Sequence, residues 1–509
     1  MNSYDKTPYK SIPILYTYLP SLAATGRLHG IDTEDPDQCR VLELGCAEGG
    51  NIIPQAWYFP STTFVGIDLS QRQIKMGQNI IEKLELPNIQ LLQADISSFK
   101  HQTDDKFHYI LLHGVFSWVS AETQESIFRQ CQSLLADNGL VYISYNTYPG
   151  WHSQMVFRDA LKLDASLYPQ KPIKERLKNL QAFFSAADNE FSNYHQRRLH
   201  ELGKHSDSYL LHEFLEENNH PIYFKDFISR AQQHSLQYIS DAYLPIDEPS
   251  LLGEKRHSFL KNIPKKIDRL QAMDFMIHQR FRRSILTHSG NKVREKFTSE
   301  HLPEVAFRTY LQSKQIASYN KIQEVKYHDL SNTKLQISVS HPITHAAISI
   351  LKSHYPGSLS FNDLLQKSCQ KVADEGDLKY LESIEHFYSE LYLLVVDDWV
   401  ALDTRSRQYA KLDSSKPLQI STLNYYYAIQ QGFMPSPCHK AIDLGKTSKI
   451  FFSQLLHGTS GEALQAMYIN EYKKKNKSTS INPFYANTYK KQAKNFIKTL
   501  ERNGLLENK

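Results

Sequence analysis

VLELGCAEGG, residues 41–50, and FVGIDLS, residues 64–70, decide the fold of the first part of this chain. A hydrophobic strand containing Glu43 leads into a glycine-containing turn, and a second hydrophobic strand ends in Asp68. Such a turn brings the N–H groups at a helix start close to a ligand, and an acid at the end of the next strand binds two ribose hydroxyls. The two stretches therefore predict a nucleoside pocket.

The spacing of the small residues indicates which nucleoside is bound. Gly45, Ala47 and Gly49 lie two apart, as in the E-x-G-x-G-x-G sequence of class I S-adenosylmethionine (SAM) methyltransferases, whereas a dinucleotide fold has G-x-G-x-x-G around a pyrophosphate. Ala47 replaces the usual middle glycine, so the turn must avoid a positive φ there or accept a small strain. The pattern predicts SAM as the cofactor, with Gly45 and Gly49 permitting close approach of the backbone.

Strands and helices alternate from residue 40 to about residue 146, which predicts a doubly wound α/β, Rossmann-like domain. The predicted strands are VLEL, FVGID, IQLLQAD, HYILLHGV and GLVYISYN. Helices are predicted from Gly49, from Ser70 as N-cap, and over AETQESIFRQCQSLLA, with Asn138-Gly139 ending the last one. Ligands of such sheets bind at the carboxyl ends of the strands, where Glu43, Asp68, Asp95 and His113 fall.

Each strand-end residue has a predicted role and an alternative. Glu43 is placed near the methionine part of SAM, or is an ordinary strand-end acid. Asp68 binds the ribose hydroxyls through a carboxylate that accepts two hydrogen bonds, or caps the helix beside Ser70. Asp95 accepts from the adenine amino group while Ile96 covers the ring, or is a simple turn aspartate.

The methyl-transfer end is predicted from the fourth and fifth strands. His113 is a candidate general base, and a structural histidine is equally compatible with its position. SYNTYPGWH, residues 144–152, gives a polar and aromatic loop suited to a substrate rim, in which Tyr145 is a second catalytic candidate. Phe116 and Trp118 either wall the acceptor channel or pack in the core.

Composition bounds the class of protein. With 59 basic and 54 acidic residues among 509, the net charge of +5 does not indicate a nucleic-acid partner. The five cysteines are scattered and predict reduced thiols and no metal site. No signal peptide and no apolar run approaching the roughly 18 residues of a membrane span are recognised, so we expect a cytoplasmic protein, with secretion by another route left open.

The rest of the chain is predicted to form accessory domains. The expected division is an arm (1–30), a SAM-binding domain (31–156), a helical regulatory domain (157–299), a winged-helix-like domain (300–405) and a small C-terminal domain (406–509). RLQAMDFMIHQRFRRSILTH, residues 269–288, shows helical spacing, and ELYLLVVDDWVALD, residues 390–403, reads as a hairpin with Asp397-Asp398 at its turn. Residues 473–477, KKKNK, form a solvated loop or a nucleic-acid contact.

Taken together, these segments resemble one bacterial family, the class I SAM methyltransferases with a methyltransferase regulatory domain, which includes rickettsial lysine methyltransferases of outer membrane proteins. The resemblance rests on YDKTPYKS (4–11), RVLELGCAEGGNIIPQA (40–56), FVGIDLS, HGVFSWV (113–119), SYNTYPGWH, YLLHEFLEENNHPIYFKDF (209–227) and RFRRSILTH (280–288). It implies SAM binding by Glu43, Gly45, Gly49 and Asp68. It also suggests that an arm containing Tyr9 and Ser11 folds over the cofactor.

The leading hypothesis is a SAM-dependent protein methyltransferase that acts on lysine, with a protein substrate and a possible homodimer. The first alternative is methylation of a small molecule or a nucleic acid, with the winged-helix-like region as a handle. The second is a SAM-binding interaction protein with little turnover, in which Ala47 marks a decayed turn.

Overall fold

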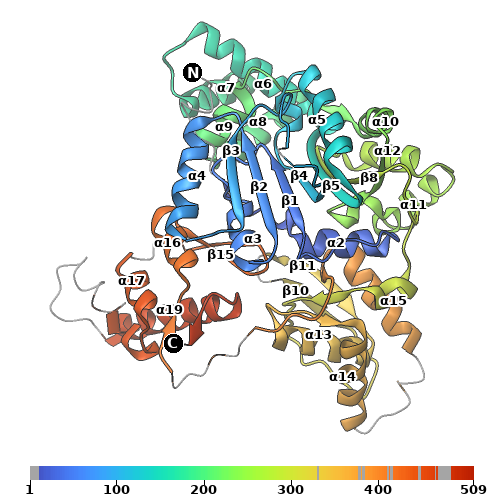
Figure 1. Cartoon of the computed structure of the whole chain (residues 1–509), viewed down its shortest axis with the longest axis vertical. Coiled ribbons are helices and arrows are strands. Elements are labelled where there is room, and N and C mark those ends of the chain that lie inside the picture. The colour runs from blue at the N-terminus through green and yellow to red at the C-terminus, as the bar shows by residue number, and fades with distance from the viewer. Residues whose placement is uncertain are drawn as a thin grey trace.

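The centre of the molecule is a sheet whose strands run in the order β3-β2-β1-β4-β5-β8-β7, with β6 paired to β5 (Figure 1). The computed structural model describes residues 11–101, 103–187, 189–329, 332–375, 380, 384–409, 412, 416–444, 449–464, 466–467, 470 and 483–508. The strands are β1 (Arg40–Leu44), β2 (Thr63–Asp68), β3 (Ile89–Gln93), β4 (Phe107–Leu112), β5 (Leu135–Tyr148), β6 (Ile222–Tyr223), β7 (Leu236–Asp241) and β8 (Phe281–His288). The five strands β1 to β5 are mutually parallel where they pair.

Helices cover both faces of this sheet, because strands buried on both faces need apolar partners on each side. One face packs against α2 (Leu19–Leu28), α3 (Ile52–Tyr58) and α4 (Gln71–Lys83). The other packs against α5 (Ala121–Leu134), α10 (Phe224–Gln233) and α12 (Lys266–Ile277). The predicted Rossmann-like fold is confirmed. Ser70 caps α4 by accepting from the Gln73 N–H at 3.2 Å, as predicted, whereas α5 ends at Leu134 and Asn138-Gly139 lies inside β5.

The last two strands of the sheet come from the segment expected to be helical. Helix α12 ends at Ile277, and residues 281–288 form β8, which pairs antiparallel with both β5 and β7. The helical prediction for this half of residues 269–288 is therefore wrong. Residues 284–287 are buried between two neighbouring strands, and this sheet environment outweighs the local helical spacing. The boundary at residue 156 stays a prediction, although the sheet continues beyond it.

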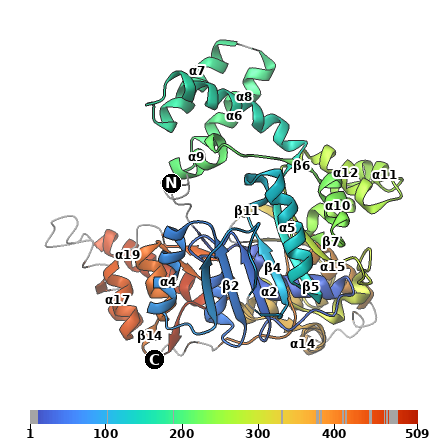
Figure 2. The same ribbon diagram turned by 45° about the horizontal axis from the view of Figure 1, so that its top comes forward.

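The chain segment that connects β5 to β6 forms a helical lobe, which stands apart from the sheet (Figure 2). It consists of α6 (Gly150–Leu167), α7 (Ile173–Ala187), α8 (Glu190–Leu202) and α9 (Asp207–Leu215). Its own core includes Phe157, Leu177, Leu199 and Phe214. Two shorter helical turns, η3 (Leu244–Asp247) and η4 (Pro249–Leu252), and α11 (Glu254–Leu260) connect β7 to α12.

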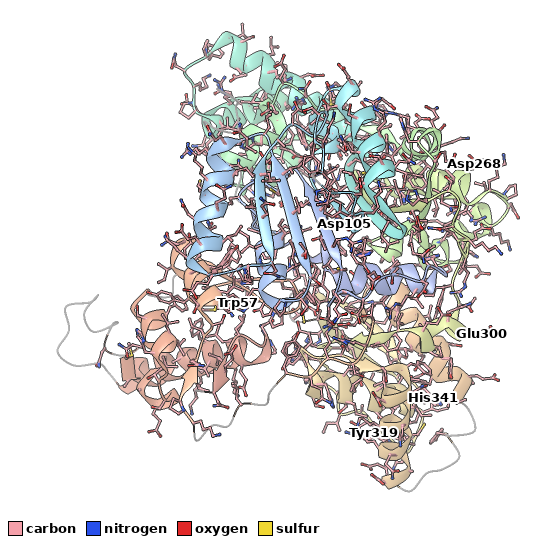
Figure 3. All side chains as sticks on the ribbon, in the orientation of Figure 1. Trp57, Asp105, Asp268, Glu300, Tyr319 and His341 are labelled. Atoms are coloured by element: carbon pink, nitrogen blue, oxygen red, sulfur yellow. The ribbon has the colours of Figure 1, made fainter. Side chains whose placement is uncertain are left out.

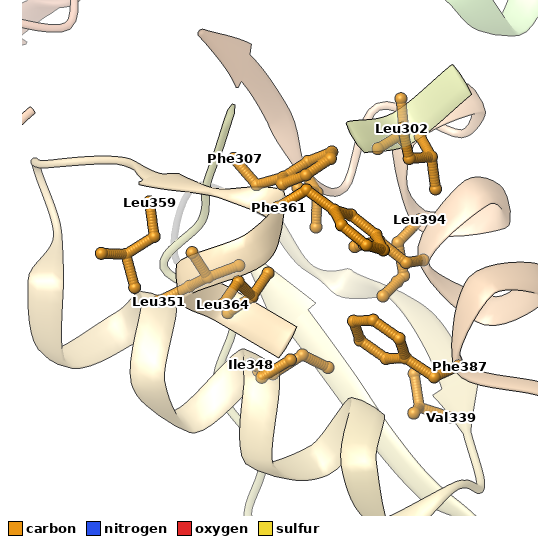
Figure 4. Close-up of a cluster of buried hydrophobic side chains, with 14 of the residues drawn as sticks. Leu302, Phe307, Val339, Ile348, Leu351, Leu359, Phe361, Leu364, Phe387 and Leu394 are labelled. Atoms are coloured by element: carbon orange, nitrogen blue, oxygen red, sulfur yellow. The ribbon is translucent and has the colours of Figure 1, made fainter. Parts of the chain in front are cut away.

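Residues 299–403 form a unit whose core also includes Ala24 and Leu28 of α2. Its elements are η5 (Ser299–Glu304), β9 (Ala306–Arg308), β10 (Val325–Asp329), β11 (Asn332–Val339), α13 (Pro342–His354), β12 (Leu359–Ser360), α14 (Phe361–Asp374), α15 (Ile384–Val396) and β13 (Ala401–Asp403). Figure 4 shows Phe307, Phe361 and Phe387 converging in that core. The hairpin predicted over residues 390–403 is wrong in its first arm, which belongs to helix α15; the winged-helix comparison stays a prediction.

The last region packs directly on the α/β domain. It contains β14 (Leu418–Gln419), α16 (Thr422–Gln430), β15 (Phe433–Pro435), β16 (Ala441–Asp443), α17 (Lys449–His457), α19 (Pro483–Arg502) and β17 (Glu507–Asn508). Leu423, Tyr427 and Phe433 share one apolar cluster with α3 and α4, and Trp57 of α3 lies at this junction (Figure 3). The KKKNK stretch lies outside the described residues.

Candidate active site

The turn after β1 is held by the end of the neighbouring strand. The N–H groups of Gly45 and Cys46 donate to the Ile67 carbonyl at 2.8 and 2.9 Å. Gly45 has φ +75°, and a β-carbon there would lie 2.5 Å from the Val115 side chain, so the position requires glycine. Ala47 has φ +52° and thus adopts the left-handed conformation, which is the strained one of the two outcomes considered from the sequence.

Asp68 joins the turn to the end of β2. Its Oδ2 accepts from the Ala47 N–H at 2.9 Å, and its Oδ1 accepts from the Ser70 N–H at 2.8 Å. A carboxylate oxygen has more than one lone pair, so a carboxylate that accepts from a backbone N–H can also accept from a hydroxyl. The structure brings Asp68 and the glycine-containing turn together, and it places the carboxylate where the two predicted ribose contacts are compatible with its backbone contacts.

Glu43 is buried beneath the same turn, and only one of its two carboxyl oxygens has a hydrogen-bond partner. Its Oε1 accepts from Asn51 Nδ2 at 2.7 Å, while its Oε2 is buried and has no hydrogen-bond partner. Burial raises the pKa of this carboxyl to about 8, against the lowering effect of the Asn51 hydrogen bond. A buried acceptor without a partner costs free energy, and a cationic ammonium ligand offsets that cost.

Asp95 and Ile96 follow β3 at the same edge of the sheet. Asp95 is exposed, and its Oδ1 accepts from the Ser97 N–H at 2.7 Å, as in an ordinary turn. Ile96 is buried in the core that faces α5. These contacts agree with the alternative of a turn aspartate and leave Asp95 accessible, so the adenine contact stays a prediction.

His113 lies after β4 and is held by β5. Its Nδ1 is 2.9 Å from Tyr142 Oη, and the N–H of Gly114 donates to Ser144 Oγ at 2.8 Å. Burial and the nearby Arg283 cation lower the His113 pKa to about 3. The imidazole is therefore neutral at physiological pH and a weak proton acceptor, which favours a positioning role over general base catalysis.

Tyr145 is not brought together with His113. Tyr142 belongs to the core on the α3 side of the sheet, whereas Tyr145 belongs to the core on the α5 side. The Tyr145 hydroxyl is 2.9 Å from Ser284 Oγ, and its ring stacks on Phe227 with centroids 3.9 Å apart. Side chains alternate between the faces of a strand, so the residue that meets His113 is Tyr142. The sequence contained this signal, because side chains two residues apart in a strand lie on the same face and Tyr142 and Tyr145 are three apart.

The two other aromatic candidates, Phe116 and Trp118, lie in different environments. Phe116 is buried and contacts Phe128 and Phe227 edge to face, so it packs in the core. Trp118 is half-buried and lies edge to face with Trp151, with ring centroids 6.3 Å apart. Trp118 and Trp151 therefore bring residues of the fourth-strand loop and of the SYNTYPGWH segment into contact, as a substrate rim requires.

The N-terminal arm lies on the cofactor turn. Tyr9 lies outside the described residues, but Ser11 contacts Gly50 so closely that a β-carbon there would lie 2.4 Å from the Ser11 carbonyl oxygen. Farther along, the Ile14 N–H donates to Asn51 Oδ1 at 2.9 Å. This position is compatible with the predicted lid, in which Tyr9 and Ser11 cover SAM; the contacts to SAM themselves stay predictions.

Arg283 of β8 was not recognised in the sequence. Its guanidinium lies over the rings of Tyr16, Phe281 and Tyr243, at 4.6, 5.0 and 5.7 Å from their centroids. Phe281 contacts His113 edge to face, so Arg283 and His113 share one aromatic environment. Because β8 was predicted to be helical, no periodicity in the sequence connected these residues.

The side chains and backbone groups of this site fit SAM. Glu43 has a buried oxygen without a partner that would accept from the ammonium of the methionine part, and the predicted role of Asp68 is to accept from the ribose hydroxyls. No group of three or more histidine, cysteine or acidic residues suited to a metal ion occurs in the part of the chain that the structure describes. Fold and site together define a class I SAM-dependent methyltransferase, and its cofactor is S-adenosylmethionine.

Comparison with known proteins agrees with this class. The family model described as "Methyltransferase domain" matches residues 35–216, and the model described as "Predicted methyltransferase regulatory domain" matches residues 206–288. An uncharacterized protein of Rickettsia prowazekii (strain Madrid E) is 33% identical over 243 residues, which are 45% of this chain and 94% of that protein. A second protein of that organism is 28% identical over 431 residues, which are 82% of this chain and 77% of that protein.

The fold of the whole chain is similar to a solved structure. PKMT2 from Rickettsia typhi, determined in complex with AdoHcy, has a TM-score of 0.85 and 22% sequence identity, and the match covers 98% of this chain and 100% of that chain. The chain belongs to the class I SAM-dependent methyltransferases that carry a methyltransferase regulatory domain. Among the described residues, none of the helices has the length and apolar character needed to cross a membrane.

Proposed function

We propose that this enzyme transfers the methyl group of SAM to lysine side chains of a protein substrate. The observation that carries the proposal is the match to PKMT2, a name that denotes a protein lysine methyltransferase, over nearly the whole of both chains. The match covers nearly the whole of this chain, so it includes the helical lobe and both C-terminal regions. A large accessory surface suits a macromolecular acceptor better than a small molecule.

The methyl-transfer end suits an amine acceptor. A lysine ammonium, with an unperturbed pKa of about 10.4, must lose its proton before attack, and burial away from water lowers that pKa. Phe281 and Tyr142 supply aromatic surface next to His113. Because His113 is a weak base, we assign removal of the proton to water and the holding of the neutral amine to His113 and Tyr142.

The geometry of the pair allows that positioning. In the tautomer in which His113 Nδ1 donates to Tyr142 Oη, the lone pair of His113 Nε2 can accept an N–H of the amine. The amine lone pair is then left for attack on the methyl carbon. SAM supplies that methyl group on a sulfonium, in an in-line displacement whose rate depends largely on positioning.

The test uses SAM with a labelled methyl group, the purified enzyme and a bacterial or host protein extract. The proposal expects label that is removed by protease, is insensitive to nuclease and maps to lysine by mass spectrometry, with Asp68→Ala as the inactive control. Label removed by nuclease would support the nucleic-acid alternative instead. SAM binding in a calorimeter without any labelled product would support the alternative of a binding protein with little turnover. The homodimer and the cytoplasmic location stay predictions.

A further inference from the structure

A loop near the C-terminal end of the chain reaches the cofactor turn. Strands β15 and β16 form a hairpin, and its connection is closed by the Ser436 N–H donating to the Lys440 carbonyl at 2.8 Å. Within it, His439 has φ +59°, the left-handed conformation that is uncommon for a residue with a side chain. His439 is buried. The loop thus holds one imidazole in a strained and enclosed position.

His439 ends a chain of hydrogen bonds that begins at the active-site carboxyl. Its Nε2 is 2.8 Å from Asn51 Oδ1, and Asn51 Nδ2 donates to Glu43 Oε1 at 2.7 Å. The His439 ring also stacks on Tyr18, with centroids 6.3 Å apart. Asn51, which contacts Glu43, is therefore also contacted by a loop almost four hundred residues later in the sequence.

The network fixes which way the Asn51 amide points. Its oxygen accepts from the Ile14 N–H at 2.9 Å, from Thr17 Oγ1 at 2.9 Å, and from His439. Reversing the amide would turn its NH₂ group toward these donors and its oxygen toward the Glu43 carboxylate. Because burial lowers the His439 pKa to about 3, the ring is neutral and must carry its proton on Nε2 to donate here. The amide NH₂ group is thus turned toward Glu43.

The contact belongs to a packed interface. Tyr58 Oη donates to the Pro435 carbonyl at 3.0 Å, and Gln431 Nε2 donates to Glu48 Oε1 at 3.4 Å. Tyr427 and Phe433 join the apolar cluster formed by α3 beneath the turn. The last region of the chain is therefore docked on the helix that starts from the SAM-binding turn, and His439 is a buried polar contact there.

We propose that His439 is a positioning residue of the SAM site, which orients Glu43 through Asn51 toward the methionine part of the cofactor. The C-terminal region is accordingly a component of the cofactor site as well as an accessory surface. The inference rests on the proposed contact between Glu43 and the SAM ammonium. It does not depend on the identity of the methyl acceptor, because SAM binding can be measured without one.

The test compares two ligands by calorimetry. SAM carries the methionine ammonium, whereas 5′-deoxy-5′-methylthioadenosine has the same adenine and ribose without it. His439→Ala removes one hydrogen bond behind Glu43, so we expect the Kd for SAM to rise about tenfold while the Kd for methylthioadenosine changes less than about twofold. His439→Gln, whose amide N–H can replace Nε2–H, should restore SAM binding to within about threefold of the original enzyme.

Two further variants separate positioning from general damage. Asn51→Ala removes the middle residue of the hydrogen-bond network between His439 and Glu43. We expect it to weaken SAM binding and to leave methylthioadenosine binding nearly unchanged, so the test remains available if His439→Ala fails to fold. His345→Ala is the matched control, since His345 is also buried and hydrogen-bonded, to Tyr327 and to the Gln323 carbonyl, in a different unit. An equal loss of affinity for both ligands in His439→Ala, or a SAM affinity that does not change, would overturn the proposal.

Discussion

The two halves of the active site differ in how their residues are distributed along the chain. In the cofactor half, the residues predicted to contact SAM lie in one β-α-β unit, where Asp68 is bonded to the turn and Glu43 to Asn51 at the start of the helix. The methyl-transfer half combines His113 after β4, Tyr142 from β5 and Arg283 from β8. A site built within one supersecondary unit can be read from local spacing, whereas one built across strands depends on their pairing. The predictions below test this difference.

The largest effect is expected for Asp68→Ala, in the cofactor half. The variant loses both predicted ribose contacts and also the contacts to the Ala47 and Ser70 N–H groups. Hydrogen bonds to a charged group contribute about 1.5–3 kcal/mol each, so SAM binding should weaken by at least about 100-fold. Calorimetry measures this. Asp95→Ala removes one predicted contact of an exposed carboxylate, at the low end of that range, so it should cost only about tenfold. A larger loss in Asp95→Ala than in Asp68→Ala would reverse the assignment of the two acids.

Glu43 should make SAM binding depend on pH. The carboxyl, with a pKa of about 8 before SAM binds, must ionise to pair with an ammonium, so affinity falls as pH decreases below that value. Between pH 7.5 and pH 6 we expect a loss of about 20-fold, and we expect Glu43→Gln to bind about tenfold more weakly at pH 7.5 with a much flatter profile. A variant profile as steep as that of the original enzyme would assign the titration to another group.

The same variant should unfold at a higher temperature when SAM is absent. Folding raises the pKa of the Glu43 carboxyl to about 8. The folded state is therefore destabilised as pH rises from the pKa of this group in the unfolded chain toward about 8. At pH 7 the neutral glutamine avoids that cost, which is on the order of 2–3 kcal/mol from the shift in pKa. Thermal unfolding at pH 7 and pH 4 checks the sign, because the gain should nearly vanish at pH 4. A gain that is the same at both values would contradict it.

The methyl-transfer half is tested by a matched pair of tyrosines. Tyr142→Phe removes the hydroxyl that holds His113, so kcat should fall about fivefold to tenfold while the Kd for SAM stays within about twofold. Tyr145→Phe removes a hydroxyl that contacts Ser284 on the other face of the sheet, so kcat should change less than about twofold. The reverse order would restore Tyr145 as the catalytic candidate predicted from the sequence.

Ala47→Gly should have the smallest effect on the site. Glycine accepts φ +52° without the steric cost that a β-carbon carries there, so the free energy of unfolding should increase by about 1 kcal/mol or less. The N–H contact to Asp68 is retained, so SAM affinity should change less than about threefold. Chemical denaturation and calorimetry check the two quantities. A large gain in affinity would instead support the view that Ala47 weakens the turn.

Local sequence patterns predicted strands β1 to β4 of the sheet but not β8, near its other edge. The strands β1 to β4 and the cap at Ser70 were predictable, because buried strands and N-caps leave short-range signals. Residues 281–288 were misread, since a strand between two antiparallel neighbours can contain apolar residues at helical spacing. The hairpin expected near residue 390 failed for a related reason: LYLLVV is an apolar run that periodicity alone does not assign to strand or helix.

The sequence by itself determined the cofactor. The spacing of Gly45, Ala47 and Gly49, followed by Asp68 at the next strand end, specifies a local backbone arrangement, and local backbone conformation is encoded by neighbouring residues. Only the tertiary structure decided which side chains surround that arrangement. Sheet pairing placed Tyr142, and not Tyr145, beside His113, and docking of the last region placed His439 behind Asn51. The alternation of side chains along β5 separates Tyr142 from Tyr145, but only the pairing of β4 with β5 brings Tyr142 to His113. Contacts between distant segments such as these depend on packing of the whole chain.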